Sequence, residues 1–440
     1  MKKGILMKRL LLITFAFNLL FLVNASSTNK DGETRSATVK VSVTANDLIN
    51  IKAKYTDLVV EAWDKDEVEV VATVRFDGKM TDKMVEFLDN FQEYVEENIT
   101  KSGGELEINT NLDEPNKIQI GSKRVGIIVG FSEDELRLDY KIKTPRKNKY
   151  EINSSYRDLR LIGSFENMEI TQYSGELNAD FIGKAELNLK YGSASFKEIK
   201  TATMEIYEQE IEAETIGTLE ITTKYSELEI RTIDRMEAAS YESDFEFDNA
   251  GFISGNFKYG EIAIQEELGD AKLEFYEMEI EARSIKNILL TNSKYSKVTA
   301  AKIGNITYTQ SYEDETSVGI LGSFKSLDSK YGEHEIEKLT KSLNLDAYED
   351  DINIEEVSSS VESITIKGKY INSKLGLREQ SYNLKTNVKY GKVDYNESEV
   401  NVKKYIKEDD KLEVEVVSKN NSANPIQITA EGYEIDVEIN

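Results

Sequence analysis

Tyrosines recur at an almost constant interval through most of this 440-residue sequence. Successive tyrosines lie roughly 17 residues apart, and only the last gap, from Tyr348 to Tyr370, is clearly longer. A fixed period of this length is typical of repeat proteins, in which each unit stacks on the next. The tyrosines are Tyr156, Tyr173, Tyr191, Tyr207, Tyr225, Tyr241, Tyr259, Tyr276, Tyr295, Tyr312, Tyr331, Tyr348 and Tyr370. The sequence therefore predicts one long repeat array.

Apolar residues follow these tyrosines in two alternating registers. In the first register they lie three and five residues after the tyrosine, as Leu228 and Ile230 do. In the second they lie four and six residues after it, as Ile211 and Ala213 do. The first register usually reads Lys-Tyr-Gly or Lys-Tyr-Ser, and the second usually reads Tyr-Glu. Alternation of apolar and polar residues predicts short strands with one buried face, joined by bends at Gly or Ser.

Charge favours one repeat unit per coil. A coil of two units would stack Lys on Lys and Glu on Glu about 4.8 Å apart, which is unfavourable. A coil of one unit places the two registers on alternate coils, so that unlike charges become neighbours. We therefore expect about 17 residues per coil, although a coil of two units stays open at this point.

The fold class expected is all-β: a parallel β-solenoid over residues 151–396, preceded by a mostly-β N-terminal domain over 36–150. Within that domain, apolar residues recur at intervals of three and four behind Thr81, which predicts one amphipathic helix over 82–97. Residues 26–35 read as a polar linker. Residues 397–440 are expected to form a C-terminal cap, because an open solenoid end exposes unpaired strand edges.

The first 25 residues are typical of a secretory signal peptide. Lys2, Lys3, Lys8 and Arg9 are followed by an apolar run and then by Val23-Asn24-Ala25, a small-residue cleavage motif. An uncleaved N-terminal anchor is the alternative. We expect an exported protein, periplasmic or extracellular at the cell surface, with no transmembrane segment in the mature chain.

The segment Ile51–Val68 resembles the opening of a family of exported bacterial β-repeat proteins. It contains Lys54-Tyr55, the turn Trp63-Asp64-Lys65 and a valine-rich strand. The family is known as "putative adhesins", a domain of unknown function related to the auto-transporter head-GIN group. Thr56 stands where that family usually has glycine. The resemblance implies a solenoid of parallel strands and export, and it brings no catalytic residues.

Charge and composition exclude several classes of partner and site. The net charge is −26, and about −30 without the signal segment, so nucleic acid is not expected as a partner. The chain has no cysteine, which rules out thiolate metal sites, cysteine nucleophiles and disulfides. No cofactor is expected. A glycan or a cell-surface protein is the expected kind of partner, and the oligomeric state stays open.

The single histidine, His334, occupies the slot that Leu228 and Ile262 fill in other units, so it should point inward. A polar substitution in a core row accounts for it better than a metal site or a Ser-His-Asp triad. The acidic runs 313–315 and 349–351 could bind calcium between coils, but the sequence has no calcium-repeat motif, and solvated turn acids are favoured. No catalytic and no metal-binding residue is therefore predicted.

The tyrosines from Tyr156 to Tyr348 are the candidate functional residues, and they allow two interpretations. A row of rings on one face could stack on the sugars of a glycan. Alternatively, each ring packs on the rings above and below it and fixes the coil register, which we favour because the tyrosines persist in both registers. The function expected is a secreted or cell-surface scaffold or adhesin that presents a rigid acidic surface and is not an enzyme. The alternative is a polysaccharide lyase or glycoside hydrolase on the same fold.

Overall fold

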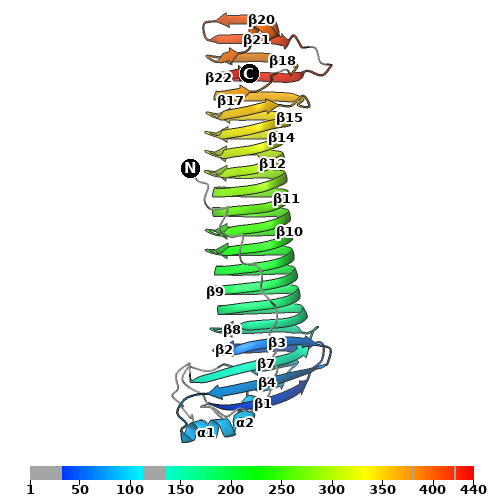
Figure 1. Cartoon of the computed structure of the whole chain (residues 1–440), viewed down its shortest axis with the longest axis vertical. Helices are drawn as coiled ribbons and strands as arrows, with labels where there is room; N and C mark the ends of the chain where they lie inside the picture. The colour runs from blue at the N-terminus through cyan, green and yellow to red at the C-terminus, as the bar shows by residue number, and fades with distance from the viewer. Residues whose placement is uncertain (1–31, 112–134, 379, 421–422) are drawn as a thin grey trace.

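The computed structural model describes residues 32–111, 135–378, 380–420 and 423–440. Stacked coils form a long column, with two short helices at the N-terminal end and an antiparallel hairpin at the other (Figure 1). Most of the described residues are in strands. The prediction of an all-β parallel solenoid preceded by a mostly-β N-terminal segment, which we call the leader, is thereby confirmed. The expected signal peptide, residues 1–25, lies outside the described residues.

The leader builds the first coil and then leaves the array before returning to it. Strands β2 (Leu48–Lys54) and β3 (Asp57–Trp63) form this coil, and they pair in parallel with β8 (Lys149–Ser155) and with the start of β9. The chain before and after this coil adds five further strands at the end of the column: β1 (Glu33–Ser42), β4 (Glu67–Phe76), β5 (Ile99–Ser102), β6 (Glu105–Asn109) and β7 (Leu136–Pro145). β6 and β7 pair in parallel with β2 and β3, and β1, β4 and β5 join them through antiparallel pairs.

The predicted helix is present as two short helices, α1 (Asp82–Asp89) and α2 (Phe91–Glu97). The Thr81 hydroxyl caps α1 by accepting a hydrogen bond from the Met84 amide at 3.2 Å. The break falls at Asn90, whose side-chain amide donates to the carbonyl of Glu86. At the edge of β1, the Gln92 amide donates to the Thr38 carbonyl and accepts from the Thr38 N–H, both at 3.1 Å. The helices thus cover a strand edge that would otherwise be open.

The array proper consists of parallel coils of one repeat unit each. Glu227 is in register with Glu210 and with Asp244, so a coil takes about 17 residues here. Farther along the chain, Lys297 is in register with Glu279 and with Glu315, so the coils there are slightly longer. The expected coil of one unit is confirmed. The strands are β9 (Leu159–Lys224), β10 (Glu227–Tyr241), β11 (Asp244–Lys294), β12 (Lys297–Tyr308), β13 (Ser311–Tyr312), β14 (Glu315–Lys330), β15 (Glu333–Tyr348), β16 (Asp351–Val357) and β17 (Ser363–Leu375).

The C-terminal strand closes the array out of sequence order. β22 (Ile426–Ile439) pairs in parallel with β17 on one side and with β18 (Tyr382–Lys389) and β19 (Lys392–Asp394) on the other. A 3-10 turn (Glu397–Glu399) then leads into the hairpin of β20 (Val400–Glu408) and β21 (Lys411–Ser418), in which β21 pairs antiparallel with β18 and β20 pairs antiparallel with β21. Part of the segment expected to be a cap is therefore itself a coil. The predicted domain boundaries stay predictions.

A continuous apolar core runs through the column. The rows predicted to face inward do so: Leu228 and Ile230 are fully buried, and so are the corresponding Phe245 and Phe247 one coil on. Burial of a large apolar side chain contributes about 1.5–3 kcal/mol, and every coil repeats that contribution. Among the described residues, no helix is long and apolar enough to cross a membrane.

Candidate binding surface

The tyrosines form an unbroken ladder of ring contacts along one corner of the column, which we call the tyrosine ladder. Neighbouring ring centroids are 4.9–5.8 Å apart throughout. In spatial order the rungs are Tyr55, Tyr156, Tyr173, Tyr191, Tyr207, Tyr225, Tyr241, Tyr259, Tyr276, Tyr295, Tyr312, Tyr331, Tyr348, Tyr370, Tyr433 and Tyr390. Every predicted tyrosine lies on this ladder.

The rungs come from two different backbone positions. One is the strand end, where Tyr241 is in register with Lys224 and Lys258 of the neighbouring coils. The other is the next residue along the chain, where the backbone bends; β9 and β11 continue through such bends, and there the strand end means the last residue before the bend. The φ of this next residue is positive in every coil, as in Tyr225 (φ 56°) and Tyr259 (φ 58°). We call this second site the left-handed position. The two sequence registers thus differ in which of these adjacent positions holds the tyrosine.

Ring geometry follows from this alternation. Tyr55 and Tyr156 both occupy the left-handed position, and their rings stack almost in parallel, at 11°. From Tyr156 onward the two positions alternate, and each pair of rings meets edge to face at 62–83°. Edge-to-face contact is a preferred aromatic arrangement and contributes about 0.5–1.5 kcal/mol per pair beyond area burial.

A left-handed backbone is costly for a bulky residue, at about 1–3 kcal/mol, and persists only where the surroundings enforce it. The ladder repeats this conformation in coil after coil, with Tyr or Glu in most of these positions. Because each left-handed tyrosine from Tyr156 to Tyr370 contacts a ring on either side, ring packing offsets the strain. The rings therefore pack on one another as the favoured interpretation expects, and their role in fixing the coil register stays a prediction.

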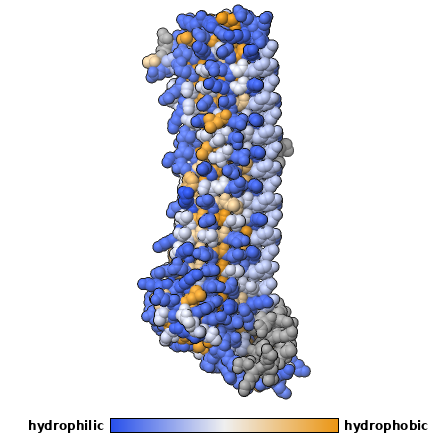
Figure 2. Space-filling view, turned by 180° about the vertical axis from the view of Figure 1, so that it is seen from behind, coloured by the Kyte–Doolittle hydropathy of each residue, from blue (hydrophilic) through white to orange (hydrophobic). Residues whose placement is uncertain are grey.

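The ladder is nevertheless a surface feature. At the left-handed position Tyr225 is 44% exposed and Tyr295 is 45% exposed, whereas most strand-end rungs are less open. In the space-filling view the ladder forms the continuous pale stripe along one edge of the column (Figure 2). Packing and exposure therefore coexist, and the two interpretations of the tyrosines do not exclude each other.

Charged side chains flank the stripe in two rows, each recurring on alternate coils. Lysines occupy the strand end where the tyrosine is left-handed, and glutamates occupy the left-handed position where the tyrosine is at the strand end. The lysine row contains Lys190, Lys224, Lys258, Lys294, Lys330, Lys369 and Lys389, and the glutamate row contains Glu208, Glu242, Glu277, Glu313, Glu349 and Glu434. Hydrogen bonding to Glu208 raises the pKa of the Tyr207 hydroxyl, and Glu242 acts in the same way on the pKa of Tyr241.

Beside the ladder, the outward positions of the following strand form an acidic face. Glu229 is in register with Glu212 and with Glu246, so carboxylates stack on carboxylates at this position. Partial burial, and then these two neighbours, raise the pKa of Glu229. The alternation of lysine and glutamate units on successive coils separates like charges beside the ladder, but it does not separate the carboxylates of the acidic face.

A buried polar chain in the solenoid interior joins four side chains from different coils. The Tyr308 hydroxyl lies 2.8 Å from Thr316 Oγ1, which lies 3.1 Å from His334 Nδ1. His334 Nε2 is in turn 3.5 Å from Asp350 Oδ2. His334 is 1% exposed, which confirms its predicted inward slot. The order hydroxyl, imidazole, carboxylate matches a catalytic triad, but Thr316, His334 and Asp350 are each at most 2% exposed.

Two buried aspartates stabilise turns beneath the ladder. Asp314 Oδ1 accepts from the Ser296 N–H at 3.0 Å, and Asp350 Oδ1 accepts from the Gly332 N–H at 2.9 Å. Serines fill the same role elsewhere, as when Ser243 accepts from the Ser226 N–H at 3.1 Å. Burial raises the pKa of Asp314 to about 7. The predicted solvated turn acids are therefore wrong for Asp314 and Asp350, because an inward turn position binds a backbone amide. The other acids of the two runs, among them Glu313 and Asp351, are exposed.

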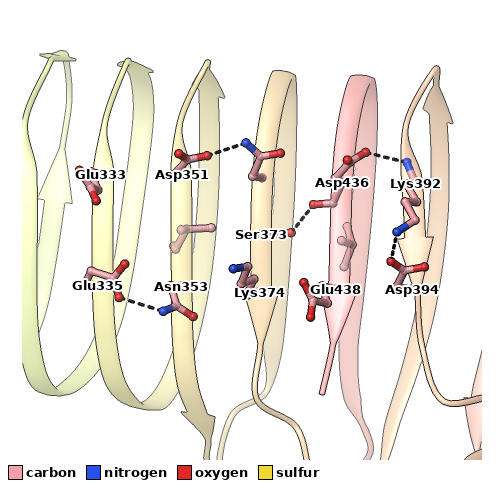
Figure 3. Close-up of a pocket in the computed structure, with 13 residues that line it drawn as sticks. Glu333, Glu335, Asp351, Asn353, Ser373, Lys374, Lys392, Asp394, Asp436 and Glu438 are labelled. Atoms are coloured by element: carbon pink, nitrogen blue, oxygen red, sulfur yellow. Dashed lines mark hydrogen bonds and ion pairs between the residues drawn. The ribbon is translucent and has the colours of Figure 1, made fainter.

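A charged groove of about 380 Å³ lies near the C-terminal end, across β15, β16, β17, β22 and β19 (Figure 3). Carboxylates from Glu333, Asp351 and Asp436 line one row across it. Lys374 and Lys392 are set among these acids. In the part of the chain that the structure describes, no three His, Asp or Glu side chains are arranged to hold a metal ion.

Four ladder residues were not among the candidates, and one of them, Tyr370, is the last tyrosine of the sequence period. Tyr55 belongs to the leader, and Tyr433 and Tyr390 follow the point where the sequence period loosens. Tyr55 carries the same Lys-Tyr signal as the array. Thr316 could have been found from the coil length, since it is in register with His334 on the next coil.

Comparison with known proteins gives structural similarity alone. No protein-family profile and no curated protein matches the chain. A "putative adhesin" from Parabacteroides merdae matches 69% of this chain and 96% of its own, with 15% identity and a TM-score of 0.29. Another from Parabacteroides distasonis matches 68% and 98%, with 15% identity and a TM-score of 0.27. A "putative cell adhesion protein" from Clostridium sporogenes matches 93% and 100%, at 9% identity and a TM-score of 0.18. At these scores the matches establish neither a shared function nor a shared ligand.

Proposed function

We propose that this chain is an exported, adhesin-like protein that binds through the tyrosine ladder while its solenoid serves as a rigid rod. The observation that carries the proposal is the ladder itself, an unbroken stripe of partly exposed rings that spans the array. Exposed aromatic stripes of this length are unusual on soluble proteins and mark contact surfaces. The rows of lysine and glutamate beside the rings supply hydrogen-bond donors and acceptors along the same line.

The shape and charge of the rod support a binding role. A parallel solenoid keeps its surface groups at fixed spacings, so little conformational entropy is lost when a ligand lies along it. The acidic face and the net charge of −26 disfavour nucleic acid and anionic lipid as partners. Export is part of the proposal, and N-terminal sequencing of secreted protein should then begin near Ser26. Full-length protein retained in the cytoplasm would contradict it.

A cell-binding assay tests the role of the ladder. Purified mature protein is labelled and its retention on bacterial and host cell surfaces is measured. The variant Tyr225→Asn/Tyr259→Asn/Tyr295→Asn removes three left-handed rings, and asparagine tolerates that backbone conformation. The matched control is Tyr405→Asn, because Tyr405 is 57% exposed on β20 and lies off the ladder. Loss of retention in the first variant alone supports the proposal, and equal retention in both overturns it.

We also propose that the protein is not an enzyme. The one histidine lies inside the closed core, where it contacts Thr316 and Asp350 rather than solvent. The charged groove at the C-terminal end is the feature that favours the alternative, a polysaccharide-active enzyme, because it gathers acids and lysines in one concave place. Incubation with a panel of polysaccharides should release no products. Product release that is lost in Asp436→Asn or Lys374→Ala would establish the alternative.

A further inference from the structure

The ladder repeats every two coils rather than every coil. Tyr225, Tyr259, Tyr295 and Tyr331 all occupy the left-handed position, and one strand-end rung separates each from the next. Neighbouring coils lie about 4.8 Å apart, so equivalent rings recur at about 9.6 Å. A ligand that lies along the stripe therefore meets identical rings at that interval.

Most of these equivalent rings are also the more exposed ones. Tyr225, Tyr295 and Tyr331 are 41–45% exposed, and between them the strand-end rungs Tyr241 and Tyr312 lie lower. Exposure does not alternate strictly, because the left-handed Tyr259 is only half-buried and the strand-end Tyr173 is 42% exposed, but most of the open rings are left-handed. A lysine and a glutamate from adjacent coils lie beside the rings in each two-coil repeat. Both hydrogen-bond donors and acceptors are thereby offered to a ligand at the same interval.

The chemistry of the stripe selects among linear polymers. Carboxylates of the glutamate row and of the acidic face repel polyanions. Aromatic rings beside hydroxyl, amino and carboxylate groups suit a ligand that has apolar C–H faces and many hydroxyls, which describes an uncharged sugar chain. A flexible or coiled chain would have to be straightened to follow a rigid stripe, so an already extended chain binds at lower entropic cost.

We infer that the tyrosine ladder binds an extended, uncharged β-1,4-linked polysaccharide that lies parallel to the axis of the solenoid. In such a chain each sugar is turned by half a turn from the previous one, so every second sugar presents the same face. Its disaccharide repeat is close to the two-coil spacing of equivalent rings. The inference rests on the proposed function, because it names the ligand class of the same surface.

Repetition gives the interaction a length dependence. Each additional disaccharide reaches one further left-handed tyrosine without a new loss of translational freedom, so affinity rises steeply with chain length. A ligand recognised in a single pocket would show affinity that levels off after a few sugars. The dependence of affinity on chain length therefore shows whether the ligand binds along the ladder or in the charged groove at the C-terminal end.

The experiment measures binding to cellulose and chitin by co-sedimentation, and to cello-oligosaccharides of increasing length by calorimetry. Amylose, whose α-linked chain coils, and alginate, which is a polyanion, serve as comparison polymers. Wild-type protein should bind the β-1,4-linked polymers, with affinity that rises across the oligosaccharide series. The variant Tyr225→Asn/Tyr259→Asn/Tyr295→Asn should bind at least about tenfold more weakly, as expected for loss of aromatic contacts. Tyr405→Asn should bind like wild type.

The outcomes distinguish the inferred polysaccharide ligand from the proposed binding function of the ladder. No binding to cellulose or chitin, together with ladder-dependent retention on cells, overturns the inference and leaves the proposed function standing; a protein ligand would then be indicated. Stronger binding to alginate or amylose than to cellulose overturns the inference as well. If neither cells nor polysaccharides are bound through the ladder, both claims fail. Circular dichroism of every variant shows whether a loss of binding reflects loss of fold.

Discussion

The rings of Tyr241 and Tyr259 meet edge to face with centroids 5.4 Å apart, although the two residues occupy different backbone positions of adjacent coils. Tyr259 has a positive φ of 58°, and Tyr241 ends a regular strand. The offset of one residue between the two registers is what brings a ring edge onto a ring face. The chain thereby builds one continuous stripe from two alternating sequence patterns.

The alanine and glycine variants should rank in opposite orders of stability at these two positions. Tyr259→Ala is expected to lower the free energy of unfolding by about 2–4 kcal/mol, because two ring contacts are lost. Tyr259→Gly should be less damaging by about 1 kcal/mol, since glycine adopts a positive φ without strain. At Tyr241 the order reverses, because glycine weakens a strand. Denaturant titration of the four variants checks this, and an unchanged stability in Tyr259→Ala would refute the packing role of the ladder.

Inward and outward residues of one strand should respond very differently to charge. Leu228 is fully buried, so Leu228→Asp places an unpaired carboxylate in a core row that neighbouring coils share. We expect a loss of about 4 kcal/mol or more, or failure to fold. Glu227 is exposed beside Glu210 and Asp244, so Glu227→Lys should be neutral or slightly stabilising. Thermal unfolding measures both, and similar damage from the two changes would contradict the register.

The buried carboxyl of Asp314 makes stability depend on pH. Burial raises its pKa from an ordinary value near 3.8 to about 7, so folding favours the protonated form. This contribution is fully present below pH 4 and is lost as the pH rises through 7, at about 4 kcal/mol in total. Asp314→Asn keeps the acceptor for the Ser296 amide and removes the charge. It should therefore raise stability at pH 8 and flatten the profile between pH 5 and 8.

The control for this change is Glu315→Gln, which removes an exposed acid one residue away. Its pH profile should follow that of the wild type. Many surface carboxylates also relieve mutual repulsion when protonated, so the informative quantity is the difference between the two variants. Equal profiles for Asp314→Asn and wild type would show that the carboxyl is not buried in solution.

The open C-terminal edge should depend on its lysines to stay unpaired. Among the residues that the structure describes, β20 pairs with β21 alone, and Lys403, Lys404 and Lys407 lie along it. Lysines and a bulge on an edge strand discourage pairing with another chain. Replacement of the three lysines by threonine should promote concentration-dependent dimers or larger assemblies. Light scattering coupled to size-exclusion chromatography detects this, and a monomer at all concentrations would refute the protective role.

Much of the architecture follows from the sequence because each coil repeats the same local pattern. The sequence alone predicted the period, the two registers and the inward rows that contain Leu228 and Phe245. Its charges favoured one repeat unit per coil. The place of Tyr433 was not readable, because it depends on β22 pairing between β17 and β18, which are earlier in the chain. Pairing between distant strands leaves little trace in local patterns.

The candidate binding surface could be predicted from the sequence only in part. The sequence identified the tyrosines but left open whether they pack or bind, and the answer depends on how deep each ring lies. Exposure of Tyr225 at 44% beside ring contacts on both sides is a property of the stacked array. The stacking of Glu229 on Glu212 and Glu246 was not expected, because the alternation of lysine and glutamate is confined to the residues beside the tyrosines.

The most direct measurement of the central claim is oxidative footprinting of tyrosines with mass spectrometry, with and without microcrystalline cellulose or intact cells. If the tyrosine ladder is the binding surface, Tyr225, Tyr295 and Tyr331 lose reactivity when ligand is present. Tyr405, which is more exposed but lies off the ladder, should keep its reactivity. Protection of Tyr405 with unchanged ladder tyrosines would contradict the claim that the tyrosine ladder is the binding surface.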